Sequence, residues 1–272
     1  MDEAKLHERL RELYEWEDVY FPEEIRHRKL TNSQDVLPKR YEKKLVELVD
    51  RFMFYTQTLI LNSSAQVEAE QRILSTAKVF NHRIEHISEL NQLSFEQNKF
   101  ILEQQTAKQR LLSFGQGGLT GLGGPFLLAA DLPLMLATNL RTVQLAAMSF
   151  GNDLRHPREM MIALKAFHVA TLPRKSQYEG WTELQAEKEI WMGRFPVFYG
   201  GNEEVTSVEW FQQPLRQIAK LMMISVLRKK MVQGIPIAGI AVGAYSNYQL
   251  ARQVSTIAGH YYERRYLEEI LQ

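Results

Sequence analysis

The chain has 272 residues and a nearly even charge balance, with 33 Lys and Arg against 32 Asp and Glu. A chain of this length can bury a substantial core, as one large domain or two smaller ones. Its net charge of +1 does not indicate a nucleic-acid binder. The absence of cysteine excludes disulfides, thiol catalysis and cysteine-ligated metals, and it suits a reducing, cytoplasmic compartment.

Membrane-spanning segments are not expected. The N-terminal residues are densely charged and lack the apolar core of a secretory signal. No window reaches about 18 consecutive apolar residues, and the mean hydropathy is -0.30. Shallow insertion at a membrane surface stays open, because two apolar runs of intermediate length occur later in the chain.

The first 37 residues are predicted to form a charged helix and a turn-rich linker bracketed by Pro22 and Pro38. The helix covers residues 3–17 and docks through one narrow apolar stripe. That stripe consists of Leu6, Leu10, Leu13 and Tyr14. Residues 38–272 are then predicted to form one helical domain.

Helical periodicity continues after the linker, without the alternation typical of strands. Amphipathic helices are predicted for residues 41–60, 67–90 and 94–112. Ser94 and Gln97 have the spacing of a capping box, which marks the start of the third helix. The side chains predicted to face inward from that helix are Phe100, Ile101, Ala107, Leu111 and Leu112. The expected fold is an all-α, multi-helix bundle.

The second half of the chain continues the same pattern. Gly151-Asn152-Asp153 predicts a helix stop, and Pro157 suits the first turn of the next helix. Further helices are predicted for residues 178–191 and 208–227. The large anchors of the first of these are Trp181, Leu184 and Trp191. The intervening segment 194–206 contains proline and glycines and is predicted to be a mobile loop.

Two glycine-rich apolar segments organise the chain, residues 114–150 and 234–252. The first contains six glycines between positions 115 and 124. They are not a Walker A loop, because no Lys-Ser or Lys-Thr follows, and no strand precedes them as in a dinucleotide site. Each segment has a glycine pair four residues apart, Gly117 with Gly121 and Gly239 with Gly243, a spacing that lets helices approach closely. We therefore predict that the two segments pack on each other.

Asp131 is the one carboxylate in the first segment, and it allows two interpretations. As the N-cap of a helix, it would place Pro133 in the first turn. As a buried acid, it would begin a polar stripe along that helix. The stripe would contain Thr138, Thr142 and Ser149, flanked by Asn139 and Arg141. A buried carboxylate is normally paired, so Arg141 or Arg252 is the expected partner.

The sequence predicts no catalytic, cofactor-binding or metal site. His82 and His86 could share a helix face, but the third ligand and the glutamate of a zinc-protease helix are missing. They are interpreted as solvated surface residues, and His168 as a half-buried structural one. No G-x-S-x-G elbow or Ser-His-Asp set is recognisable. The chain is therefore predicted to be non-enzymatic.

Basic residues precede both apolar segments. Lys108 and Arg110 lie before the first, and residues 228–230 before the second. The tail adds Arg264 and Arg265 among three tyrosines. Basic and aromatic residues beside apolar segments are typical of contact with an anionic membrane surface, although cations at helix ends also complement the helix dipole.

At the two glycine-rich segments the chain resembles the EcsC protein family. The matching patterns are AADLPLMLATNLRTVQLAAMSFG after the first glycines and IPIAGIAVGAYSNYQLARQV near the end. The resemblance covers residues 38–267, so the N-terminal helix is expected to lie outside it. It implies a bacterial helical protein whose namesake is encoded with an ABC transporter and whose biochemical role is poorly defined. The positions that match are Asp131, Pro133, Asn139, Arg141, Gln144, Gly239, Gly243 and Asn247.

Three functional hypotheses follow. The first is a non-enzymatic accessory protein, peripheral on the cytoplasmic membrane, whose partner is the membrane surface or a membrane transporter. The second is a soluble protein that binds a small hydrophobic or lipid-like ligand between the glycine-rich segments. The third and weakest is a hydrolase that uses Asp131. The candidate functional polar cluster is Asp131, Asn139, Arg141, Gln144, Asn247 and Arg252.

Overall fold

A computed structural model describes residues 3–26, 63–121, 124–172, 174–191 and 239–271. Every regular element in these ranges is helical, which confirms the predicted all-α class. Predictions for residues 41–60, the loop 194–206, the helix 208–227 and the basic run 228–230 lie outside the described residues.

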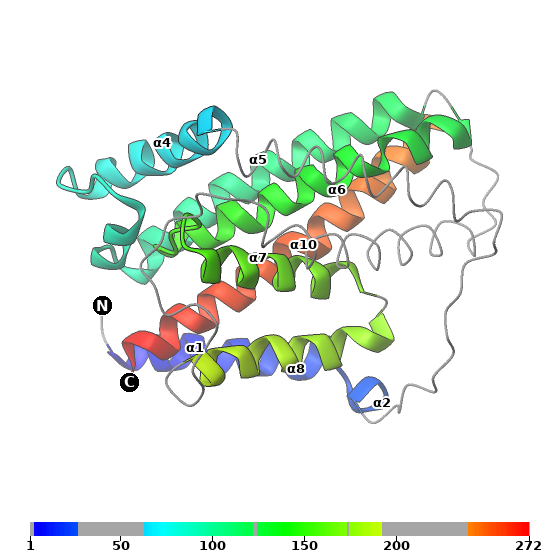
Figure 1. Ribbon diagram of the computed structural model, residues 1–272. Helices are drawn as coiled ribbons and strands as arrows, with labels where there is room; N and C mark the ends of the chain where they lie inside the picture. Colours follow the sequence, from blue (N-terminus) through cyan, green and yellow to red (C-terminus); the bar gives the residue numbers. More distant parts are fainter. Residues whose placement is uncertain (1–2, 27–62, 122–123, 173, 192–238, 272) are drawn as a thin grey trace.

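Three long helices form the centre of the molecule: α5 (Phe95–Gly121), α6 (Gly124–Ser149) and α10 (Gly239–Ile270) (Figure 1). At one end the rings of Phe95, Phe150 and Tyr266 meet, with centroids 5.4 to 6.3 Å apart. Towards the other end Phe114 of α5 meets Tyr248 of α10, at 6.3 Å. These contacts show that α10 runs antiparallel to α5 and parallel to α6.

This arrangement brings the glycine-rich ends of the three helices to the same end of the bundle, which we call the glycine end. The end of α5, the start of α6 and the start of α10 all lie there. The prediction that the helices carrying the two segments pack together is thereby confirmed. Close packing at Gly117, Gly121, Gly239 and Gly243 themselves stays a prediction, because their surroundings lie outside the described residues.

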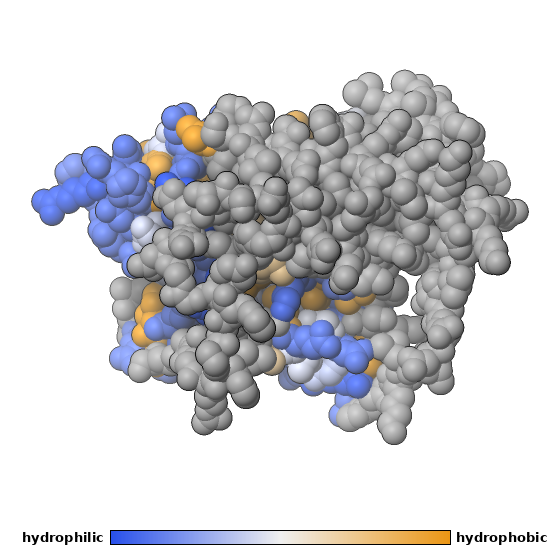
Figure 2. Space-filling view, viewed as in Figure 1, coloured by the Kyte–Doolittle hydropathy of each residue, from blue (hydrophilic) through white to orange (hydrophobic). Residues whose placement is uncertain are grey.

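Shorter elements surround the central helices. Helix α7 (Pro157–Thr171) packs on α6 and α10, and α8 (Arg174–Trp191) packs on α7. Helix α4 (Ser63–Phe80) lies against α5, and the 3-10 helix η2 (Ile87–Gln92) follows it. The end of α4 and the turn after it form a hydrophilic part of the surface (Figure 2).

The charged N-terminal helix α1 (Glu3–Tyr20) docks on α10 and leads into the short α2 (Glu23–Arg26). Leu6 and Leu13 are buried as predicted, and Leu10 is partly buried, whereas Tyr14 remains 41% exposed. Trp16 adds an aromatic anchor that the sequence did not predict. It stacks on His260 of α10 at 3.9 Å and meets Trp181 of α8 edge-on at 5.7 Å.

Several helix ends confirm the predicted signals. Pro157 occupies the first turn of α7. After α6, Gly151 adopts a positive φ of 81°, a conformation that disfavours side chains with a Cβ. Trp181 and Leu184 are buried in α8 as predicted.

Two expectations are wrong. Residues 67–90 are not one helix, because α4 ends at Phe80 and a turn follows. His82 and His86 lie in that turn, so they do not share a helix face. Asp131 is not an N-cap, because α6 begins seven residues earlier at Gly124. Pro125 takes the first-turn role there, and the helix continues through Pro133.

The predicted capping box at the start of α5 is present. The backbone N–H of Gln97 donates to Ser94 Oγ at 3.3 Å, and that of Ser94 donates to Gln97 Oε1 at 2.8 Å. Ser94→Ala removes one of these bonds, so we expect it to lower the free energy of unfolding by about 1 kcal/mol. Urea denaturation measures the change. Ser94→Asn, which preserves the cap, should lower the free energy of unfolding by no more than a few tenths of a kcal/mol. Equal losses in the Ala and Asn variants would contradict the capping role of Ser94.

Candidate functional site

The predicted polar cluster separates into parts, the first of which faces α4. Arg141 Nη1 donates to Gln144 Oε1 at 3.2 Å, and both side chains are buried. Burial and, to a smaller extent, the nearby charge of Arg72 together lower the pKa of Arg141 to about 10, against the opposing attraction of Glu68. Arg141 therefore remains protonated at neutral pH while carrying a high desolvation cost.

The predicted polar stripe of α6 is buried and bonded mostly to its own helix. Thr142 and Ser149 donate to carbonyl oxygens one turn earlier, at 3.4 and 2.8 Å. Asn139 Nδ2 donates to the carbonyl of Met135 at 2.7 Å. Such back-bonding satisfies the two hydroxyl groups and the Asn139 amide nitrogen without a ligand, so most of the stripe has a structural explanation. Asn139 Oδ1 is buried with no hydrogen-bond partner among the described residues.

The remaining members lie elsewhere. Asn247 is buried on α10, and its Oδ1 has no hydrogen-bond partner among the described residues. Arg252 is exposed, in contrast to the buried Arg141. The side chain of Asp131 lies outside the described residues, so its pairing with either arginine stays a prediction.

Towards the glycine end, α5 has the reverse of the expected polarity. Its buried side chains there are Gln105, Thr106, Gln109 and Ser113. In contrast, Leu111 is 71% exposed, Leu112 53% and Phe114 52%. Leu111, Leu112 and Phe100 were all predicted to face inward, and all three predictions are wrong; only Ile101 of that set is fully buried.

The exposed apolar side chains continue onto α10. Tyr245 is 61% exposed, and Tyr248, one turn later, contacts the ring of Phe114. We call Leu111, Leu112, Phe114 and Tyr245 the outer patch. Because α5 and α10 lie side by side at this level, the patch spans both helices.

Cations lie beside the outer patch. Lys108 is exposed and precedes Leu111 and Leu112 by three and four residues, so it shares their helix face. Arg110 Nη1 lies 3.5 Å from Ser255 Oγ of α10. Arg252 lies between Ser255 and Tyr248 along α10, which places it level with the same part of α5.

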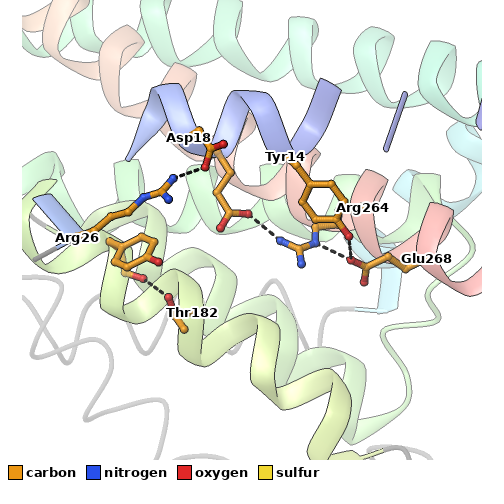
Figure 3. A network of polar contacts seen from close by, with 8 residues as sticks. Tyr14, Asp18, Arg26, Thr182, Arg264 and Glu268 are labelled. Carbon is orange, nitrogen blue, oxygen red and sulfur yellow. Dashed lines mark hydrogen bonds and ion pairs between the residues drawn. The ribbon is translucent and has the colours of Figure 1, made fainter. Parts of the chain in front are cut away.

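The basic tail forms ion pairs within the protein. Arg264 donates to Glu17 of α1 and to Glu268, each at 2.7 Å, and Tyr14 also donates to Glu268 (Figure 3). Arg264 therefore fastens α1 to α10.

Its neighbours complete an ionic clamp, defined as Glu263, Arg264 and Arg265. Glu263 accepts from Arg9 of α1 at 2.6 Å. Arg265 donates two hydrogen bonds to Glu159 of α7, at 2.6 and 2.9 Å. The spacing of each arginine to a glutamate four residues later could have indicated pairing, but the partners on α1 and α7 are too distant in sequence to predict.

The part of the chain that the structure describes shows no metal site. No group of three His, Asp or Glu side chains there could hold a metal ion. The buried carboxylate of Glu159 is paired with Arg265.

Two half-buried histidines, His168 and His260, make stability depend on pH. Burial lowers the pKa of His168 and His260 below the ordinary 6.5. As pH falls through 6.5, the unfolded chain binds protons on these histidines that the folded chain does not. Their contribution to the free energy of unfolding is therefore complete above this pH and is lost progressively below it. We expect the free energy of unfolding, measured in urea, to fall from about pH 6.5 downward, by at most about 1.4 kcal/mol per pH unit for each histidine. The double variant His168→Gln/His260→Gln should flatten this dependence; an unchanged slope would refute the assignment.

The fold and the sites define an all-helical protein built on a three-helix unit with its glycine-rich helix ends gathered at one end. The chain belongs to the EcsC protein family, whose family model matches residues 7–267. The match includes most of α1, so the expectation that the N-terminal helix lies outside the family pattern is wrong.

Two relatives from Bacillus subtilis (strain 168) are similar along much of the chain. "Uncharacterized protein YdbA" is 23% identical over 98% of this chain and 94% of its own length. "Protein EcsC" is 24% identical over 74% of this chain and 78% of its own length. No solved structure matches.

Proposed function

We propose that the protein is a non-enzymatic accessory protein that associates peripherally with an anionic membrane surface through the outer patch. The observation that supports this most is the exposure of Leu111, Leu112, Phe114 and Tyr245 beside Lys108 and Arg252. Large apolar side chains gathered at one place on a surface mark interaction sites, and neighbouring cations favour an anionic partner.

The expected free energies of these contacts are those of reversible binding to a membrane surface. Full burial of one large apolar side chain contributes about 1.5–3 kcal/mol, and a basic residue near an anionic surface about 1 kcal/mol. Several of each can hold a protein at a bilayer without a spanning segment. Among the described residues, no helix is long and apolar enough to cross a membrane.

We also propose that the protein acts together with a transport or secretion system. Its support is the family resemblance, because no described contact identifies a transporter. The membrane surface is the partner for which the geometry gives direct support.

Vesicle flotation tests the proposal. Full-length protein should float with vesicles that contain phosphatidylglycerol, and float less with vesicles of phosphatidylcholine alone. Raising the salt concentration should weaken binding, because screening reduces the contribution of Lys108, Arg110 and Arg252. Failure to float with either vesicle would overturn the proposal.

A second candidate function is the binding of a lipid-like ligand between α5 and α10. It is favoured by Ser113 Oγ and Asn247 Oδ1, which are buried without hydrogen-bond partners among the described residues. The two residues adjoin the contacting rings of Phe114 and Tyr248. Native mass spectrometry of purified protein should then show a copurified lipid; a ligand-free spectrum would count against this candidate.

A further inference from the structure

The interface between α5 and α10 buries several polar side chains, two of which, Ser113 and Asn247, lie on the glycine side of the contact between Arg110 and Ser255. Where α5 meets α10, the buried side chains include Gln105, Gln109 and Ser113 from α5 and Asn247 and Ser255 from α10. In water, burying amides and hydroxyls while exposing leucine and phenylalanine is unfavourable on both counts. In a bilayer both terms reverse, because lipid favours an apolar exterior and polar side chains find partners inside.

The register of α5 and α10 orders the side chains along the bundle axis. The contacts of Arg110 with Ser255 and of Phe114 with Tyr248 place Lys108 and Arg110 on the side of the outer patch away from the glycine end. Arg252 lies between Ser255 and Tyr248 on α10, level with Leu111 and Leu112. A layer of cations, then aromatic and aliphatic side chains, is the order from lipid headgroups inward.

The length of the apolar end matches one leaflet. From Leu111 to the end of α5 at Gly121, ten helical rises span about 15 Å. From Tyr248 back to the start of α10 at Gly239, nine rises span about 14 Å. The hydrocarbon core of a bilayer is about 30 Å thick, so both lengths correspond to roughly half of it.

We propose that the glycine end of α5, α6 and α10 penetrates one leaflet of an anionic bilayer as a polar-cored wedge, with Lys108 and Arg110 at the headgroups. This inference rests on the proposed membrane association and specifies its depth and orientation. Adsorption on the headgroups alone would leave the exposed apolar side chains of the outer patch outside the hydrocarbon. A wedge of this length reaches the bilayer midplane without crossing it.

The absence of cysteine allows site-specific labelling of the whole chain. Leu112→Cys and Leu111→Cys place an environment-sensitive NBD fluorophore on the outer patch. Val79→Cys on α4 and Val19→Cys on α1 are matched controls, because both valines are apolar and 80% exposed. Circular dichroism of each labelled variant, compared with the unaltered chain, verifies folding.

With phosphatidylglycerol-containing vesicles, the Leu111 and Leu112 labels should brighten several-fold and shift to the blue. Lipids with a doxyl group on the acyl chain should quench them more strongly than lipids with a headgroup quencher. The Val19 and Val79 labels should change little.

The outcomes separate the two proposals. Protein that floats with vesicles while its Leu111 and Leu112 labels stay aqueous would overturn the wedge and leave membrane association standing. Stronger quenching from the headgroup than from the acyl chain would do the same. Protein that does not float overturns both. If label brightness instead rises with protein concentration in the absence of lipid, the patch joins two copies of the chain and the wedge is wrong.

Discussion

Replacing Leu111 and Leu112 together by glutamine should weaken binding to anionic vesicles by roughly 100-fold. The two leucines are 71% and 53% exposed in the isolated protein, so their transfer into lipid removes substantial apolar surface from water. A loss of about 3 kcal/mol from two such side chains corresponds to roughly two factors of ten in affinity. Titration of the protein with vesicles, followed by tryptophan fluorescence or sedimentation, measures the change.

The same substitution should leave folding nearly unaffected, because exposed positions contribute little to the core. We expect a change in the free energy of unfolding within about 0.5 kcal/mol for each site. Val19→Gln/Val79→Gln is the matched control and should bind vesicles as the unaltered protein does. Equal weakening in both double variants would show that membrane binding does not use the outer patch.

Arg265→Ala should lower the free energy of unfolding by about 3–5 kcal/mol. The side chains of Arg265 and Glu159 are only 12% and 11% exposed and are joined by two hydrogen bonds. Burial alone would lower the pKa of Arg265, but the hydrogen bonding and charge of Glu159 outweigh it and raise the pKa. Removing one partner leaves the other as a buried, uncompensated charge, which is the costly case.

Two companion variants test this explanation in urea denaturation. Glu269→Gln removes the more exposed partner of Arg265 and should cost less than about 1 kcal/mol. Replacing both buried partners, as in Glu159→Leu/Arg265→Leu, should recover much of the stability lost in Arg265→Ala, because no buried charge remains. A double variant as unstable as the single one would contradict this explanation and favour a packing role for the arginine stem.

Local signals predicted much of the fold. Ser94 with Gln97, Pro157 and the glycine at 151 each act through the backbone of their own turn, so their positions could be inferred from sequence alone. The docking stripe of α1 was also predictable, because Leu6 and Leu13 have helical spacing and few apolar neighbours.

The orientation of α5 could not be predicted in this way. Periodicity identifies two faces of a helix, and the apolar face was assigned to the core. In α5 beyond residue 103, glutamine and serine take the inner face while Leu111 and Leu112 take the outer one. That choice depends on the surroundings of the helix, which a sequence pattern does not report.

Ion-pair partners that are distant along the chain could not be predicted either. Arg264 and Arg265 resemble a membrane-facing tail until the carboxylates of Glu17 and Glu159 are placed beside them. Those partners are 247 and 106 positions away along the chain. The candidate polar cluster stays a prediction, because the side chain of Asp131 lies outside the described residues. Arg141 and Gln144 bond to each other within α6, whereas Arg252 is on the surface of α10.

Hydrogen exchange of the unaltered full-length chain, with and without phosphatidylglycerol-containing vesicles, tests the membrane-inserted glycine end most directly. We predict that exchange slows in peptides covering residues 108–115 and 245–252, because lipid would exclude water from these helix turns. Exchange in α1 should not change. Slower exchange confined to α1, or no change at residues 108–115 on vesicles that carry bound protein, would contradict the account.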